Sequence, residues 1–427
     1  MSSTASTASA EPAGRQYSTF RIVLTVFLPF AGGYFLSYLF RSVNAIIAPD
    51  LTRELGLSPA DLGLLTSAYF LSFACMQLPL GIAMDRFGPR RVQACFLLSA
   101  ALGALVFGLG QDKLTLLAGR ALIGIGVAGG LMTSFKAIVL WFPASRWPLV
   151  NGCFMAMGGL GALSATQPVE WALGLTDWRG IFFVLAAITL AVALTIFLVV
   201  PEKPASGRPV ALREQIASLR MIYRDPLFWC IAPCGIFSMA STMAIQGLWA
   251  GPWLADVAVL PRADVARHLL VLTAAMTAGF VLTGALADFL ARRGFGIYRT
   301  MSLGVVLILS VQLLLVLQVA PGAYWVWALF GLTANVTVLC YPILSRHFPT
   351  EYAGRANSAL NLPVFAAAFA LQYAIGGIIG LWPATAGGGQ PPMAYAAAFA
   401  LPLALQFVSF LWMIWRGRSL ESLAPSR

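Results

Sequence analysis

Twelve apolar runs of roughly 20 residues, separated by short polar stretches, follow one another along this chain of 427 residues. A helix of about 20 residues crosses the ~30 Å hydrocarbon layer of a bilayer, because an α-helix rises 1.5 Å per residue. The runs therefore predict an all-α membrane protein with twelve transmembrane helices, called segments 1 to 12 below. They cover residues 21–48, 60–84, 92–110, 114–141, 149–172, 179–200, 227–252, 265–288, 299–319, 323–345, 357–381 and 394–415.

Charge is scarce and lies mostly between the apolar runs. Only 10% of the residues are charged and 59% are hydrophobic, too little charge to cover the surface of a soluble protein of this length. The net charge of +11 would suggest nucleic acid in a soluble chain. Here the cations sit in the connecting loops, where they orient a membrane protein. We expect the lipid bilayer, and no nucleic acid, as a partner.

Basic residues are distributed unequally between the two ends of the predicted bundle. Nineteen of the 27 lysines and arginines fall in stretches that share a side with both termini, and five fall on the opposite side. The remaining three, Arg41, Arg120 and Lys136, lie inside segments. Positively charged loops remain in the cytoplasm during insertion, so both termini are predicted to be cytoplasmic.

The chain divides into two similar halves. The longest polar stretch, residues 201–225, separates an N-terminal six-helix bundle, 20–200, from a C-terminal one, 226–415. Residues 1–19 and 416–427 read as cytoplasmic tails, the first disordered. Ala48-Pro49 recurs as Gly251-Pro252, an offset of 203 residues, and Phe142-Pro143 recurs as Phe348-Pro349, an offset of 206. Such matches at nearly one offset indicate an internal duplication.

A charged glycine motif joins segments 2 and 3. It reads G-I-A-M-D-R-F-G-P-R-R from Gly81 to Arg91, and a second copy, G-A-L-A-D-F-L-A-R-R, runs from Gly284 to Arg293. Gly81 permits close helix approach, and Gly88-Pro89 predicts a tight turn. With the twelve segments and the duplicated halves, this loop resembles the signature of the major facilitator superfamily. Arg120, in G-R-A-L-I-G-I-G, resembles its arginine motif in the fourth helix.

The resemblance implies a bacterial type of transporter with two pseudo-symmetric six-helix bundles around a central cavity. Segments 1, 4, 7 and 10 would line that cavity, and rocking of the bundles would expose it to each side in turn. It also implies a multi-pass protein of the inner membrane that works as a monomer without cofactors. Segment 5 is glycine-rich but lacks the Gly-Pro pair typical of antiporters. The residues expected to act in gating are Asp85, Arg86, Arg90, Arg91, Arg120, Asp288 and Arg292.

Segment 1 carries a polar stripe that includes a buried arginine. Tyr34, Tyr38, Arg41 and Asn44 fall on one third of the helix circumference, with apolar residues on the rest. A polar stripe on a membrane helix faces protein or water rather than lipid. Arg41 therefore needs an anion, which is either the transported solute or a structural partner such as Glu170.

Segment 4 carries two cations that cannot point to the same place. Arg120 and Lys136 are sixteen residues apart, so a straight helix turns them about 160° from each other. Arg120 is predicted to brace helix packing, with Glu170 as a possible partner. Lys136 either lines the inner cavity or extends to the cytoplasmic surface.

Polar and aromatic residues of the second half complete the predicted solute site. Segments 7, 10 and 11 offer amides and aromatic rings that suit an organic solute, although ordinary interhelical hydrogen bonds would also explain them. The full set of expected solute contacts is Tyr34, Tyr38, Arg41, Asn44, Lys136, Gln246, Trp249, Asn335, Tyr341 and Asn361.

The positions of the acidic residues indicate which charge the solute carries. None of the 16 lies in the middle of a segment, whereas three cations do. A positive cavity favours an anion. The prediction is therefore a secondary active transporter that moves a small, anionic organic solute across the inner membrane by alternating access.

Other functions have weaker support in the sequence. Met239 and Met243 resemble a copper-import motif of the same superfamily, but the companion methionine position is occupied by Leu272. Nitrate transport would need arginines in segments 2 and 8; segment 2 has none, and segment 8 has none apart from Arg267, which we count with the preceding loop. A membrane sensor that does not transport would need a signalling domain, which the short tails do not provide. No nucleophile–His–acid set, metal-ligand cluster or phosphate loop points to an enzyme.

Overall fold

The computed structural model describes residues 18–143, 146–202, 212–385 and 388–421. Within them, eleven helical stretches are long and apolar enough to cross a membrane. The part of α4 before Pro79 supplies the twelfth span, because α4 reverses direction at Gly88 (φ 76°, ψ 163°). Gly88 adopts a backbone conformation that side chains disfavour, and the turn predicted at Gly88-Pro89 is present. The prediction of twelve transmembrane helices is confirmed.

The N-terminal half contains segments 1 to 6. Segment 1 is built from several consecutive helical pieces, and segments 2 and 3 are the two arms of α4. The helices are α1 (Thr19–Ile22), η1 (Val23–Phe27), α2 (Leu28–Ser42), α3 (Asn44–Leu55), α4 (Pro59–Leu109), α5 (Lys113–Val127), α6 (Gly130–Trp141), α7 (Trp147–Ser164), α8 (Gln167–Leu173) and α9 (Trp178–Val199).

The C-terminal half follows a short amphipathic helix, α10 (Leu212–Tyr223), which lies within the predicted polar stretch. Segments 7 to 12 then repeat the arrangement of the first half. The helices are α11 (Pro226–Ala244), η3 (Ile245–Trp249), α12 (Ala250–Asp256), α13 (Arg262–Arg292), α14 (Ile297–Val316), α15 (Tyr324–Thr333), η4 (Val336–Leu339), α16 (Cys340–His347), α17 (Thr350–Ile379) and α18 (Pro392–Glu421).

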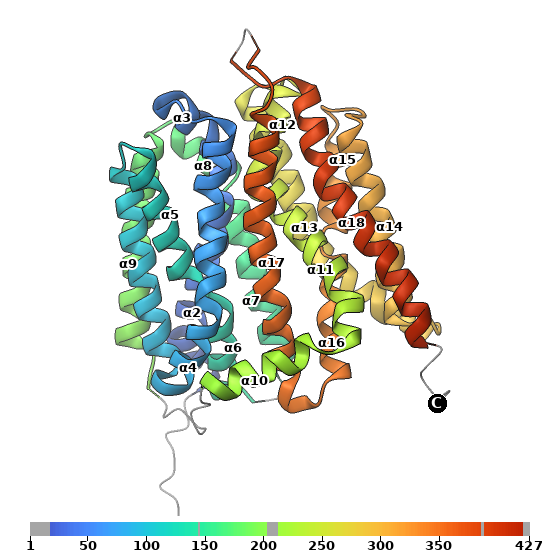
Figure 1. Cartoon of the computed structure of the whole chain (residues 1–427). Coiled ribbons are helices and arrows are strands. Elements are labelled where there is room, and N and C mark those ends of the chain that lie inside the picture. Colours follow the sequence, from blue (N-terminus) through green and yellow to red (C-terminus); the bar gives the residue numbers. More distant parts are fainter. Residues whose placement is uncertain (1–17, 144–145, 203–211, 386–387, 422–427) are drawn as a thin grey trace, which may run out of the picture.

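The two halves lie side by side, with their helices roughly parallel to one long axis (Figure 1). We call the end of the bundle that carries α10 and the end of α18 the terminal end. The opposite end, which carries α3, α8 and α12, is called the distal end (Figure 1). Every feature of the site below is placed along this axis.

Segments 1, 4, 7 and 10 are interrupted, segments 4 and 10 near their middles and segments 1 and 7 closer to the distal end. The breaks fall at Val43, at residues 128–129, at the π-helix η3 and at residues 334–335. Offsets of 203 and 206 relate the breaks in pairs, so the interruptions belong to the repeated design. A proline lacks the N–H that would bond four residues back, and Pro252 follows η3 closely. Interrupted membrane helices are tolerated where protein or a cavity satisfies the freed backbone groups.

The hydrophobic core is divided unequally along the axis. One large cluster contains residues of both halves, such as Ile47 and Trp249, and occupies the distal part. Two separate clusters occupy the terminal part, one around Phe154 in the N-terminal half and one around Phe228 in the C-terminal half. The halves therefore share a core at the distal end and have separate cores at the terminal end.

Candidate functional site

Arg41 lies where the two halves meet, near the middle of the bundle. Its guanidinium carbon is 4.5 Å from the centre of the Tyr38 ring in the N-terminal half and 5.7 Å from that of Phe365 in the C-terminal half. Its buried Nε has no hydrogen-bond partner, and the described residues give it no ion pair. The positive charge is thus held between aromatic faces, which attract a cation, and has no protein anion to neutralise it.

Glu170, the acid considered as a partner for Arg41 or Arg120, pairs with another residue. Arg262, at the start of α13, places its Nε 2.7 Å from Glu170 Oε2 and its Nη2 2.7 Å from Asp50 Oδ2. Both carboxylates belong to the N-terminal half and Arg262 to the C-terminal half. Their side chains are 16% and 15% exposed, so the ion pairs are partly shielded from water. This triad joins the two halves at the distal end.

Hydrogen bonds between the halves lie next to the triad, on its terminal side. Gln246 Nε2 donates to Ser42 Oγ at 3.0 Å, and Gln372 Nε2 donates to Thr66 Oγ1 at 2.5 Å. Trp249 is fully buried beside them and donates from Nε1 to the carbonyl of Gln372. Gln246 and Trp249, which were expected to contact solute, are therefore engaged here in closing the distal end.

Small residues let the backbones of the two halves approach closely at this level. A Cβ added at Gly251 of α12 would lie 2.4 Å from the carbonyl oxygen of Ala45, and one at Gly376 of α17 would lie 2.3 Å from that of Pro59. Pro49 has no N–H to bond with the Ala45 carbonyl, which is therefore free to face α12. Close packing, hydrogen bonds and ion pairs together shut the distal end.

Aromatic and amide side chains line the space on the terminal side of Arg41. Tyr34 and Tyr38 have their hydroxyl oxygens 3.3 Å apart in the N-terminal half. Across from them, the Tyr341 hydroxyl donates to Asn361 Oδ1 and lies 3.8 Å from the sulfur of Met239. Asn361 is one helical turn from Phe365, the residue that packs over Arg41. The structure thus gathers five of the expected solute contacts around one region between the halves.

Helices α7 and α13 show how the halves separate toward the terminal end. A Cβ added at Gly159 of α7 would lie 2.6 Å from Thr277 of α13, so the helices touch there. Gly152 and Gly284 lie seven residues closer to the terminal end, on the same faces, and about 10 Å along the axis. A Cβ added at either would meet nothing within 4 Å. Helices α7 and α13 therefore touch at Gly159 and are apart at the level of Gly152.

Lys136 lies at the terminal end and is already neutralised. Its Nζ is 2.7 Å from Asp85 Oδ1 and 3.0 Å from the carbonyl oxygen of Met84. This differs from the expectation that Lys136 faces solute together with Arg41. The physical reason is that the flexible lysine side chain reaches the carboxylate of the loop motif, in the same half. Asp85, expected in gating, forms this pair within its own bundle.

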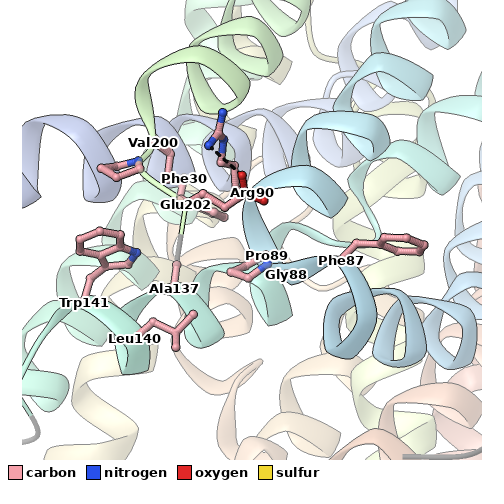
Figure 2. Close-up of a pocket in the computed structure, with 11 residues that line it drawn as sticks. Phe30, Phe87, Gly88, Pro89, Arg90, Ala137, Leu140, Trp141, Val200 and Glu202 are labelled. Atoms are coloured by element: carbon pink, nitrogen blue, oxygen red, sulfur yellow. Dashed lines mark ion pairs between the residues drawn. The ribbon is translucent and has the colours of Figure 1, made fainter. Parts of the chain in front are cut away.

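The two copies of the loop motif differ. In the first copy, Arg90 donates to the Phe197 carbonyl and Arg91 lies 2.6 Å from Glu202. Figure 2 shows Arg90 and Glu202 side by side at a pocket that Phe87, Gly88 and Pro89 also line. Arg86 packs over the Phe87 ring.

The second copy makes fewer contacts. Asp288 and Arg292 are exposed, and neither has an ion pair among the described residues. Asp288 lines a pocket together with Arg346. The first copy is therefore tied to its own half, while the second is available for other contacts.

Three further expected residues are buried in the packing. Arg120 is 1% exposed, donates from Nη1 to the Phe40 carbonyl at 3.0 Å and packs over Tyr69, so it braces segments 1, 2 and 4. Asn335 donates to the Met276 carbonyl at 2.7 Å. Asn44 is fully buried, and neither polar atom of its amide has a partner among the described residues.

The metal alternative has little geometric support. Met239 contacts Tyr341, and Met243 packs against the two large core clusters. The described residues contain no group of three or more His, Cys, Asp and Glu side chains that could hold a metal ion. Cys340 Sγ lies 3.5 Å from the sulfur of Met301, deep in the C-terminal core.

Sequence reasoning missed the residues that join the halves. Arg262 was counted only among the five basic residues opposite the termini, and Phe365 was not singled out. A usable signal existed for the triad, because Asp50, Glu170 and Arg262 all border the distal ends of apolar segments. No comparable signal marked Phe365, whose position over Arg41 depends on tertiary packing.

Comparison with known proteins is consistent with this geometry. The chain is 23% identical over 310 residues to the D-galactonate transporter of Escherichia coli O6:H1, covering 67% of this chain and 70% of that one. It is 28% identical over 181 residues to the "probable sulfoacetate transporter" of Cupriavidus necator, covering 42% of each chain. The matches to the first curated relatives thus span about two fifths of their length.

Solved structures share the fold. A bacterial homologue of the human lysosomal transporter Spinster, in an inward-facing and unoccupied conformation, superposes with a TM-score of 0.77 at 18% identity, covering 96% of this chain and 99% of that one. A D-xylose–proton symporter superposes with a TM-score of 0.67 at 16% identity, covering 92% and 97%. The family model of the Major Facilitator Superfamily matches residues 30–362. This chain is a multi-pass membrane protein that belongs to the Major Facilitator Superfamily.

Proposed function

We propose that this protein is a secondary active transporter that moves a small organic anion across the bacterial inner membrane by alternating access. The single observation that carries the proposal is Arg41, a permanent cation between the two halves without an anionic partner among the described residues. An arginine presents planar donors that match a carboxylate or a sulfonate. The anionic group of the solute would bind there.

The relatives support an anionic solute. The names of the two described above refer to galactonate and to sulfoacetate, and both compounds are organic anions at neutral pH, the first with one negative charge and the second with two. The names do not agree on one compound, so they support the chemical class of the solute. Tyr34, Tyr38, Tyr341 and Asn361 would surround the uncharged part of such a solute.

The packing of the halves supports alternating access. Their contacts are concentrated at the distal end, while α7 and α13 are apart at Gly152 and Gly284. With cytoplasmic termini, as the lysine and arginine distribution predicts, this arrangement corresponds to a conformation open to the cytoplasm. The opposite state would break the distal contacts and close the terminal end.

Uptake into proteoliposomes containing the full chain tests the proposal, with galactonate, glucuronate and sulfoacetate as probes. We expect Arg41→Gln to reduce uptake about 30-fold or more, because it removes the positive charge to which the anion is proposed to bind. Arg41→Lys should retain part of the activity. Arg267→Gln is the matched control, since Arg267 is exposed and pairs with Asp264 in its own helical turn.

Equal uptake by the parent protein and Arg41→Gln would contradict the role of Arg41. Failure of every organic anion to be transported or bound would contradict the proposed function as a whole.

A further inference from the structure

Few basic side chains inside the segments lack an ion pair, and they can be counted among the described residues. Three basic residues lie inside segments. Lys136 is paired with Asp85, and Arg120 is buried where it donates to the Phe40 carbonyl. Among the described interior residues this leaves Arg41, between the two halves, as the one cation without an ion pair or a backbone carbonyl partner.

Neutral groups surround the rest of that space. On the terminal side of Arg41, the polar side chains of the C-terminal half include the phenol of Tyr341 and the amide of Asn361, which share a hydrogen bond. Asn361 precedes Phe365 by four residues, about 6 Å along α17, so it lies one turn from the ring that packs over Arg41. The hydrogen bond from Tyr341 uses Asn361 Oδ1 and leaves the amide nitrogen able to donate.

A second negative charge on the solute would therefore meet no second unpaired cation among the interior residues that the structure describes. A buried carboxylate that loses its hydration needs an ion pair or several donated hydrogen bonds, which one amide and one phenol supply only in part. A hydroxyl at the same position would be well satisfied, because it both donates and accepts.

Resting on the proposed function, we infer that the solute is a monovalent acid: one anionic group binds Arg41, and a neutral, hydrogen-bonding remainder lies against Tyr341 and Asn361. Monocarboxylates should bind in preference to dicarboxylates of the same carbon skeleton. The two distal carboxylates, Asp50 and Glu170, do not change the charge near Arg41, because both form ion pairs with Arg262.

Matched acids test the inference on the unmodified full chain. The probes are galactonate with galactarate, and threonate with tartrate; within each pair the diacid carries a second carboxylate in place of the terminal CH2OH group. At pH 7.5 all of these carboxylates are ionised. Ligands that bind the folded protein raise its apparent melting temperature, so titrations in detergent or nanodiscs give relative affinities. We expect each monoacid that binds to do so at least tenfold more tightly than its diacid.

A diacid that binds as tightly as its monoacid, or more tightly, overturns the inference and leaves the proposed function intact. If no acid of either charge binds or is transported, the proposed function and the inference fall together. The comparison requires no mutation, so it decides the question even if a variant fails to fold.

Adding a cation at the neutral end should change the preference. In Asn361→Lys we expect the ratio of monoacid to diacid affinity to fall at least tenfold, because the second carboxylate then gains a partner. Asn361→Gln keeps a neutral amide and is the control, for which the parent preference should persist. An unchanged ratio in Asn361→Lys would show that the second carboxylate does not reach this residue, and would overturn the placement of the solute.

Discussion

The distal and terminal ends of this protein use the same pair of halves in opposite ways. At the distal end the halves share one hydrophobic core, exchange hydrogen bonds and are joined by Arg262 with Asp50 and Glu170. At the terminal end each half has its own core, and the charged groups of the first loop motif pair within their own half. The same helices, α7 and α13, are in contact at Gly159 and apart at Gly152.

The difference identifies which interactions would have to change in the alternating access proposed above. Contacts within a half, such as Lys136 with Asp85, can persist while the halves rotate against each other. Contacts between halves, such as Gln246 with Ser42, have to break when the distal end opens. Arg41 lies between the two sets and touches an aromatic ring from each half. An anion bound there can contact both halves and so influence their equilibrium.

The largest predicted effect comes from reversing the charge of Arg262. In Arg262→Glu three carboxylates would face one another at the distal end, which we expect to destabilise distal closure by about 2 kcal/mol or more and shift the equilibrium about 30-fold. A cysteine placed at Ala48, which is 2% exposed, reports distal opening through its rate of labelling by a maleimide. The exposed native Cys75, Cys95 and Cys153 are first replaced by serine.

Arg267→Glu is the matched control for this prediction, because it reverses a nearby charge that does not join the halves. The expected result is fast labelling in Arg262→Glu and slow labelling in the control. Equally slow labelling in both would mean that the triad is not needed for distal closure.

A smaller effect is predicted for Gly251→Ala, which adds one methyl group at the tightest contact of segment 1 with segment 7. The new Cβ would lie 2.4 Å from the Ala45 carbonyl oxygen, so the helices must move apart. Overpacking of this kind costs about 1–3 kcal/mol, and we expect the labelling rate at position 48 to rise about tenfold.

Gly247→Ala is the control for this substitution, one turn away on the same helix. The nearest atom to its Cβ would be the Arg41 carbonyl oxygen at 3.8 Å, an ordinary contact. The same labelling rate in Gly251→Ala and Gly247→Ala would indicate that the close approach at Gly251 does not limit distal closure.

The sequence alone was enough to predict the fold, because the same signal, a long apolar run, occurs in each of the twelve segments. Each transmembrane segment must be long and apolar, and the turn at Gly88-Pro89 has a local cause. The polar stripe of segment 1 also singled out Arg41, which the fold places between rings of the two halves. Local patterns of this kind depend on few residues that are close in sequence.

The arrangement between the halves could not be predicted in the same way. Arg262 is 212 residues from Asp50 and 92 from Glu170, so no local pattern links them. Lys136 illustrates the same limit, since its position in segment 4 allowed both a cavity and a surface placement. Only the folded position of Asp85 distinguishes them. The conformation of the protein also matters. Gln246, expected to contact solute, is hydrogen-bonded to Ser42 in this conformation and helps to close the distal end.

The smallest predicted effect, of opposite sign, is at the terminal end. Gly284→Ala meets no atom within 4 Å in the present conformation, and alanine favours a helix by up to about 1 kcal/mol over glycine. The conformation described here should therefore keep or slightly gain stability, and labelling at position 48 should stay slow. Closing the terminal end would bring Gly284 toward Gly152, where small residues allow close approach. We expect uptake to fall about threefold, as for an overpacked contact.

The double variant Gly152→Ala with Gly284→Ala separates this explanation from a local effect of either alanine. If the two positions meet in the alternate state, the added methyl groups oppose each other, and the loss of uptake should exceed the product of the single effects. If the positions never meet, the single effects should simply multiply. That result would limit the closure of α7 against α13 to the level of Gly159, and the terminal end would then have to close through other helices.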